Sequence, residues 1–309
     1  MSAPAPSTVR LRLPATSANL GPAFDAAGLA LSMALHLEAH PSPQWTIEAS
    51  GRDAAACSVL EGNLIISSYE RTLAEAGRVA LPLALKLRNE IPLGMGCGSS
   101  AAAICAGVAL ANAFGALQLD DAGIVRAATA IEGHPDNVAA CWLGGFTTSA
   151  QTAAGEVVTA TFAGDPAWPL LLALQPTSLA TTKARALLPA TYSRADAVFN
   201  IQRSALLTAS FARHDAALLR EAMRDRLHQP YRETACPLLG ALLPMLETSE
   251  AGVPEIAGVA LSGAGPSVLV VAAAETSALD VEMRMRRLVP KETEILHLRI
   301  GSAAECVAS

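Results

Sequence analysis

The sequence predicts an α+β fold built in two layers, on the basis of three observations. Alternating apolar segments typical of strands occur near both ends and in the middle of the 309 residues. Apolar-periodic segments typical of helices are interleaved with these strands. The order lacks the regular strand–helix–strand rhythm of a parallel sheet. The length suits two domains or one large one.

The first predicted elements are strands at residues 8–13 and 29–37, where apolar residues alternate. A polar, turn-rich connection over residues 14–25 joins them and carries Asn19 and Asp25 as candidate ligand groups. Connections of this length usually carry function.

A helix is predicted at residues 64–76, a strand at 83–91 and a second helix at 100–114. Residues 91–119 contain no charged side chain and are long enough to span a membrane. The proline, glycines and serines at the start of this run argue against a lipid-facing helix. We therefore expect a helix buried inside a domain.

Asp120 is a good N-cap for a helix that runs to about Ile131, before Gly133 and Pro135 end it. Strands are predicted at 145–151, 157–162 and 170–175. A Gly-Asp-Pro turn at 164–166 marks the expected boundary between domains 1–164 and 165–309.

The second half is predicted to contain helices at 196–212 and 215–226, each capped by its first aspartate. Apolar strands at 256–261 and 267–273 flank a glycine-rich turn, which is either a plain hairpin connection or a site contact. A helix at 277–288 and a strand at 294–300 complete the prediction.

The composition is 51% apolar, 16% charged and 4% aromatic, whereas an average soluble protein is about 25% charged. Disordered and fibrous classes are therefore excluded. The net charge is −6 and there is no dense run of lysine and arginine, so we expect neither nucleic acid nor a membrane as a partner. Only three residues are lysines, so a site for carboxylate or phosphate is expected to use arginine.

The cysteines are scattered, with no C-x-x-C pair and no secretory leader before them. We expect a cytoplasmic protein with reduced thiols, most of which fill the core. They are Cys57, Cys97, Cys105, Cys141, Cys236 and Cys306.

A glycine-rich loop at residues 92–102 combines alternate glycines, two serines and the first turn of an uncharged helix. Such a loop turns backbone N–H groups toward an anion, and the helix N-terminus adds partial positive charge. It matches neither the lysine-containing P-loop nor the dinucleotide fingerprint. The alternative is a tight strand-to-helix turn with Ser100 as a cap.

Glu132 falls at the negative end of its predicted helix, where an acid is unfavourable unless something positive offsets it. A Mg²⁺ ion that bridges phosphate oxygens would do so, and Asp136, four residues later, could polarise a hydroxyl. The alternative is an exposed glutamate beside an ordinary capping box.

Together and in this order, these stretches resemble the GHMP small-molecule kinases, and within them the homoserine kinase family. Residues 92–102 resemble the family's ATP loop, and residues 262–267 resemble its third motif. Residues 14–22, 132–139 and 225–232 resemble the homoserine kinases in particular. The resemblance implies an N-terminal domain like the second domain of ribosomal protein S5 and a C-terminal ferredoxin-like domain, an α/β-plait.

The resemblance further implies transfer of the γ-phosphoryl group of ATP, with Mg²⁺, to the hydroxyl of L-homoserine. The product would be O-phospho-L-homoserine, on the route to threonine. Ser100 and Glu132 are the implied Mg²⁺ ligands, and Asn63 is a weaker nucleotide contact. The implied phosphate loop consists of Pro92, Leu93, Gly94, Met95, Gly96, Cys97, Gly98, Ser99, Ser100, Ala101 and Ala102.

Asp136 is the implied catalytic residue, as proton acceptor or as orienting group. Members of the family are often dimers, and the sequence leaves a homodimer open. The implied substrate contacts are Asn19, Asp25, Asn137, Thr181, Arg185 and Arg232, with the two arginines on the carboxylate. Taken singly, the arginines would be ordinary surface charges.

The sequence departs from the family pattern at Ala23, Cys97 and Ala140, where Gly, Leu and Pro are usual. No charged or hydrogen-bonding group is lost, and Ala23 matters only if its φ is positive. Two alternatives remain: a GHMP kinase for another hydroxylated metabolite such as mevalonate, and a non-catalytic ligand sensor.

Overall fold

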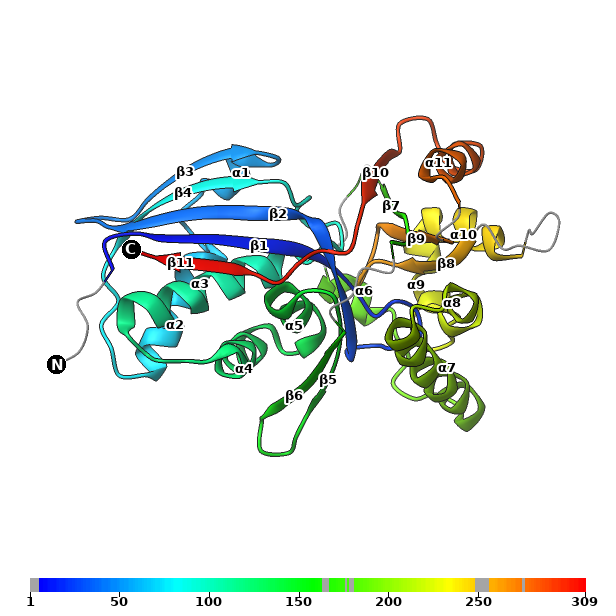
Figure 1. Ribbon diagram of the computed structural model, residues 1–309, viewed down its shortest axis with the longest axis horizontal. Coiled ribbons are helices and arrows are strands. Elements are labelled where there is room, and N and C mark those ends of the chain that lie inside the picture. Colours follow the sequence, from blue (N-terminus) through cyan, green and yellow to red (C-terminus); the bar gives the residue numbers. More distant parts are fainter. Residues whose placement is uncertain (1–5, 163–166, 176, 178–180, 248–255, 274–275) are drawn as a thin grey trace.

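The computed structural model describes residues 6–162, 167–175, 177, 181–247, 256–273 and 276–309. Two sheets lie next to each other along the long axis, each with helices packed against it (Figure 1). This arrangement confirms the predicted α+β class. The predicted turn at 164–166 lies outside the described residues.

Among the described residues the first sheet has seven strands, and its main path runs in the order β11-β1-β2-β4-β3. The hairpin of β5 and β6 extends from β2. All pairs are antiparallel except β3 with β4. The strands are β1 (Val9–Ala18), β2 (Ala27–Pro41), β3 (Thr46–Gly51), β4 (Leu83–Asn89), β5 (Phe146–Gln151), β6 (Val157–Phe162) and β11 (Glu305–Ala308).

Alternation in β1 and β2 sets the register of this sheet. Leu11 pairs with Leu37 and Leu13 with Leu35, and all four leucines are buried. A one-residue slip would turn them toward solvent. Both strands are longer than predicted, because the polar residues up to Ala18 also pair with β2.

Helices cover one face of the first sheet: α2 (Leu64–Glu75), α3 (Ser99–Gly115), α4 (Asp121–Glu132) and α5 (Pro135–Leu143). Small residues let α3 pack closely, since a Cβ at Gly107 would lie 2.5 Å from the carbonyl oxygen of Ile65. Most of α3 is buried, as predicted. No helix in the described ranges is both long and apolar enough to cross a membrane.

The second sheet has the order β10-β7-β9-β8. Its strands β7 (Leu170–Leu174), β8 (Ile256–Leu261) and β9 (Val268–Ala272) are fully buried, and β10 (Glu294–Leu298) forms an edge. Arg52, after β3, donates hydrogen bonds to Glu294 and so connects the two sheets. The remaining elements are α1 (Ala54–Cys57), α6 (Thr181–Ala186), α7 (Arg194–Arg213), α8 (Ala216–Ala222), α9 (Gln229–Arg232), α10 (Pro237–Leu242), α11 (Ala278–Arg286) and short 3-10 turns at Glu233–Ala235 and Leu243–Leu246.

Helix caps follow the predictions in two of three cases. Asp120 accepts from the N–H of Gly123, and Asp215 accepts from that of Ala217. The prediction that Asp196 caps its helix is wrong, because Ser193 accepts from the Asp196 N–H and α7 begins at Arg194. The helix predicted at 215–226 ends at residue 222, and β3, β11 and several short helices had no clear periodic signal.

Candidate active site

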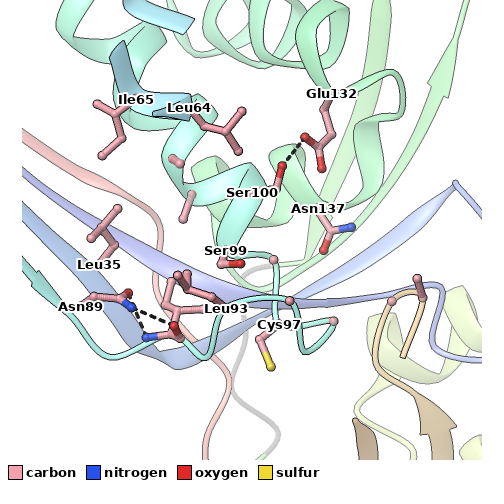
Figure 2. Close-up of a pocket in the computed structure, with 18 of the residues that line it drawn as sticks. Leu35, Leu64, Ile65, Asn89, Leu93, Cys97, Ser99, Ser100, Glu132 and Asn137 are labelled. Atoms are coloured by element: carbon pink, nitrogen blue, oxygen red, sulfur yellow. Dashed lines mark hydrogen bonds between the residues drawn. The ribbon is translucent and has the colours of Figure 1, made fainter. Parts of the chain in front are cut away.

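One cavity of about 510 Å³ brings together residues from both halves of the chain. Figure 2 shows its two sides: the apolar Leu35 and Ile65 lie apart from the polar Ser100, Glu132 and Asn137. The glycine-rich loop passes between them. The cavity therefore offers an apolar compartment and a polar one, joined at the loop.

Three alternate glycines shape this loop. Gly94, Gly96 and Gly98 have φ of 68°, 75° and 70°, a region that other residues rarely adopt. The backbone thus turns at every second residue and leads directly into α3, whose first-turn N–H groups have no partner within the helix. The arrangement fits the predicted anion site.

Two distant motifs support the loop. The N–H of Thr16 donates to the carbonyl oxygen of Cys97 at 3.0 Å, and Ser262 Oγ donates to that of Gly96 at 2.7 Å. The turn that contains Ser262 is therefore part of the site and more than a hairpin connection. Burial raises the pKa of the Cys97 thiol to about 12, which leaves it unreactive.

Replacing Gly98 with alanine is expected to destabilise the protein by about 3 kcal/mol and to raise the KM for ATP. A Cβ there would lie 1.8 Å from Thr16 Oγ1, at a φ of 70°. Gly77→Ala is the control, because Gly77 has a similar φ of 66° but open space around it. Urea unfolding and ATP kinetics check this; equal effects of the two substitutions would contradict it.

Most of the predicted phosphate-loop residues line the cavity, but three do not. Ala101 is fully buried against the core, and Pro92 and Met95 lie outside the lining. The lining members are Leu93, Gly94, Gly96, Cys97, Gly98, Ser99, Ser100 and Ala102.

Ser100 and Glu132 form a direct pair. Ser100 Oγ donates to Glu132 Oε2 at 2.8 Å, and Figure 2 shows the two side chains pointing toward each other. The alternative that Ser100 caps α3 is wrong, since the N-cap is Gly98 and no side chain bonds there. Burial raises the pKa of Glu132, and the bond from Ser100 opposes this shift.

The donor set of this pair suits Mg²⁺, which prefers a few carboxylate and hydroxyl oxygens beside phosphate. Glu132 is the last residue of α4, at the negative end of the helix, and its partly buried carboxylate is disfavoured there. A bound cation would relieve both penalties. The residues present therefore fit the ion.

Asp136 lies in the first turn of α5 and is 1% exposed. Its Oδ1 is 2.6 Å from His134 Nδ1 and accepts from the Asn137 N–H at 2.7 Å. This contact with Asp136 raises the pKa of His134. His134 was not among the site residues predicted from the sequence, although it lies only two positions before Asp136.

Asp25 and Arg185 pair with each other across the polar compartment. Nη1 and Nη2 of Arg185 donate to the two carboxylate oxygens of Asp25, each at 2.8 Å. Asn19 holds this loop, because its Oδ1 accepts from the Asp25 N–H and its Nδ2 donates to the Gly263 carbonyl. Ala23 has no positive φ, so its departure from the family pattern adds no strain there.

Arg232 is 1% exposed and lines the cavity, so the alternative of a surface charge is wrong for it. Within the described ranges no carboxylate lies at ion-pair distance from it. Its guanidinium donates to the Ala184 carbonyl at 3.2 Å and to His228 Nδ1 at 3.1 Å. Phe24, also overlooked in the sequence, places its ring centroid 5.4 Å from Arg232 Cζ.

The three remaining predicted residues, Asn63, Thr181 and Asn137, lie on different elements. Asn63 lines the cavity and caps α2, where its Oδ1 accepts from the N–H of Ile65. Thr181 is the first residue of α6, and its side chain lies outside what the structure describes. Asn137 Oδ1 accepts from Thr16 Oγ1 at 2.7 Å, which ties α5 to β1.

Two family descriptions match the chain. Residues 63–145 match "GHMP kinases N terminal domain" and residues 207–291 match "GHMP kinases C terminal". These segments cover more than half of the chain and contain the glycine-rich loop, Glu132 and Arg232.

Several relatives match most of the chain. A homoserine kinase from Solibacter usitatus is 43% identical over 85% of this chain and 85% of its own. One from Carboxydothermus hydrogenoformans is 39% identical, covering 96% and 91% of the two chains. A solved structure from Listeria monocytogenes, described as a homoserine kinase, has a TM-score of 0.77 and 31% identity, covering 97% and 99%.

Proposed function

This chain belongs to the GHMP kinases, and within them to the homoserine kinases; from that membership we propose that it phosphorylates L-homoserine. The γ-phosphoryl group of ATP passes to the side-chain hydroxyl, and the products are ADP and O-phospho-L-homoserine. This reaction places the protein in threonine biosynthesis.

The observation that carries the substrate assignment is the buried guanidinium of Arg232. A buried cation without an acid partner is costly, and a ligand carboxylate would compensate it. Phe24 and Arg185 stand beside it, the latter with its Cζ 5.1 Å from the Phe24 ring centroid. The polar compartment therefore favours a substrate with a carboxylate.

The ion pair of Asp25 and Arg185 supports a substrate that also carries an ammonium group. A zwitterionic amino acid offers both charges, so its carboxylate can take Arg185 while its ammonium takes Asp25. Asn19, Asn137 and Thr181 complete the proposed substrate contacts. Mevalonate has a carboxylate but no ammonium, and so it would offer no cation to Asp25.

Asp136 is proposed to orient the acceptor hydroxyl and to receive its proton as the new O–P bond forms. Its Oδ1 is already engaged by the Asn137 N–H and by His134, so Oδ2 is the oxygen left to accept the hydroxyl proton. Phosphoryl transfer needs mainly positioning and charge neutralisation, for which a fixed carboxylate suffices.

The phosphates are proposed to lie against residues 94–102, with the base in the apolar compartment near Asn63. Ser100 and Glu132 would hold a Mg²⁺ ion, which neutralises charge on the transferring phosphoryl group when bound. The loop backbone and the N-terminus of α3 would hold the phosphates in line with the hydroxyl.

We also propose the division into domains 1–164 and 165–309, a cytoplasmic location and a homodimer as one assembly. The family matches fall on either side of residue 164. The last strand, β11, crosses back and pairs with β1. Residues 305–308 of the proposed second segment thus form an edge strand of the first sheet.

The test is an ADP-release assay with Mg²⁺-ATP and a panel of L-homoserine, mevalonate, galactose and shikimate. We expect turnover of L-homoserine alone, and a kcat lower by about 100-fold in Asp136→Asn, since a positioned carboxylate contributes about that factor. Turnover of another compound in its place would show that the protein is a GHMP kinase with a different substrate. ATP binding with no turnover on any compound would favour a ligand sensor.

A further inference from the structure

His228 is a fully buried histidine that the proposed reaction does not use directly. Its Nδ1 lies 3.1 Å from a guanidinium nitrogen of Arg232, and its Nε2 lies 2.7 Å from the carbonyl oxygen of Gly21. A guanidinium can only donate and a carbonyl can only accept. Nδ1 must therefore be the acceptor, and Nε2 must carry the proton.

The surroundings of His228 fix the ring in this orientation. Asp225 accepts from the backbone N–H groups of Leu227, His228 and Gln229 at 2.9, 3.0 and 2.7 Å. The ring of Phe24 lies on the other side, with its centroid 5.4 Å from that of His228. The imidazole is therefore held in one orientation and one tautomer.

We infer that His228 is a positioning residue for the substrate carboxylate: its neutral ring holds one edge of Arg232 and ties that arginine to the loop around Gly21. The inference rests on the proposed function, in which Arg232 binds the carboxylate of L-homoserine. Nε is engaged by Ala184, and Nη1 by His228 and, at 3.5 Å, by the Gly263 carbonyl, so the donors of Nη2 are left for the ligand. The tie to Gly21 places Phe24 and Asp25 at a set position relative to those donors.

The role depends on the ring staying neutral. Burial lowers the pKa of His228, and Arg232 adds to this shift, whereas Asp225 and Asp25 oppose it. Asp225 Oδ2 is 3.7 Å from Nε2, but its carboxylate is already saturated by backbone N–H groups and by Asn200. Protonation would remove the acceptor and set a second cation against Arg232. The KM for L-homoserine should thus rise only below the ordinary histidine pKa of 6.5, as the pH approaches the lowered pKa of His228, while the KM for ATP stays constant.

Two substitutions separate the two bonds of the ring. Asparagine keeps an acceptor near the position of Nδ1 and loses the donor to Gly21, whereas glutamine keeps the donor and loses the acceptor. For His228→Gln we expect a KM for L-homoserine at least about 10-fold higher, with kcat within about 3-fold, the loss typical of one hydrogen bond to a charged group. For His228→Asn, which keeps the bond to Arg232 and loses only the tie to Gly21, we expect a smaller increase in this KM, of about 3-fold, and no further rise at low pH.

Equal effects of the two substitutions on KM, or a wild-type KM that does not change with pH, would overturn the inference. Circular dichroism and thermal unfolding identify a variant that has simply lost its fold. The proposed function fails separately, if the wild-type protein makes no O-phospho-L-homoserine. Long-range ¹H–¹⁵N NMR of the six histidines then still tests the geometry, because a proton on Nδ1 of His228 at neutral pH would contradict it.

Discussion

Replacing Arg232 with methionine is expected to lower kcat/KM for L-homoserine by about 100- to 1000-fold, with little change in stability. Truncating one partner of a buried charged pair costs about 2–5 kcal/mol of binding. In the free protein, methionine avoids the free-energy cost of burying the guanidinium cation. This gain offsets the loss of the hydrogen bonds from Arg232 to Ala184 and His228, each worth about 1 kcal/mol. We therefore expect a free energy of unfolding within about 1 kcal/mol of the wild-type value.

The selectivity of the same variant identifies the group that Arg232 recognises. Wild-type protein should strongly prefer L-homoserine over 3-amino-1-propanol, which lacks the carboxylate, and Arg232→Met should lose most of that preference. Arg213→Met, at the exposed end of α7, is the control and should behave as wild type. An unchanged preference in Arg232→Met would show that another group binds the carboxylate.

Replacing Glu132 with glutamine is expected to lower kcat by about 100-fold or more, because a Mg²⁺ ligand contributes several kcal/mol of transition-state stabilisation. Binding of L-homoserine, measured by calorimetry, should be unaffected. In thermal unfolding, Mg²⁺ with ATP should stabilise the wild-type protein more than the variant. Glu70→Gln, on the exposed face of α2, is the control.

Without divalent cations the same substitution should make the protein more stable. Burial raises the pKa of Glu132 in the folded state, so ionisation costs stability as pH rises above the unfolded value of 4.5. Glutamine carries no such cost. The difference in unfolding free energy should therefore favour Glu132→Gln at pH 8 and vanish below about pH 4. A variant that is less stable than wild type at pH 8 would contradict this.

Most of the secondary structure and the position of the phosphate loop could be predicted from local sequence patterns. The strands β6 and β8 were bounded correctly because an apolar pattern along a strand is a local property, which in β8 is a continuous apolar run. The loop could be recognised in the sequence because its backbone has positive φ at alternate positions, and glycine is the residue that adopts this conformation most readily. The elements that escaped prediction, such as β3 and β11, are short and largely exposed: β3 half-buries only Ile47 and Ala49, and all four residues of β11 are exposed. So short a stretch offers too few alternations for a clear periodic signal.

The pairing of the charged residues depends on contacts between distant segments, which a local pattern does not contain. Taken singly, Arg232 looks like a surface charge in the sequence, and only the resemblance to the kinases implied a carboxylate contact there. Its burial against His228 and Phe24 depends on β1, α9 and the turn near Gly263 meeting at one place. The same holds for Asp25 and Arg185, which are 160 positions apart and form one ion pair. Periodicity reports which face of an element is apolar, but the partner of a charge is set by packing between distant segments.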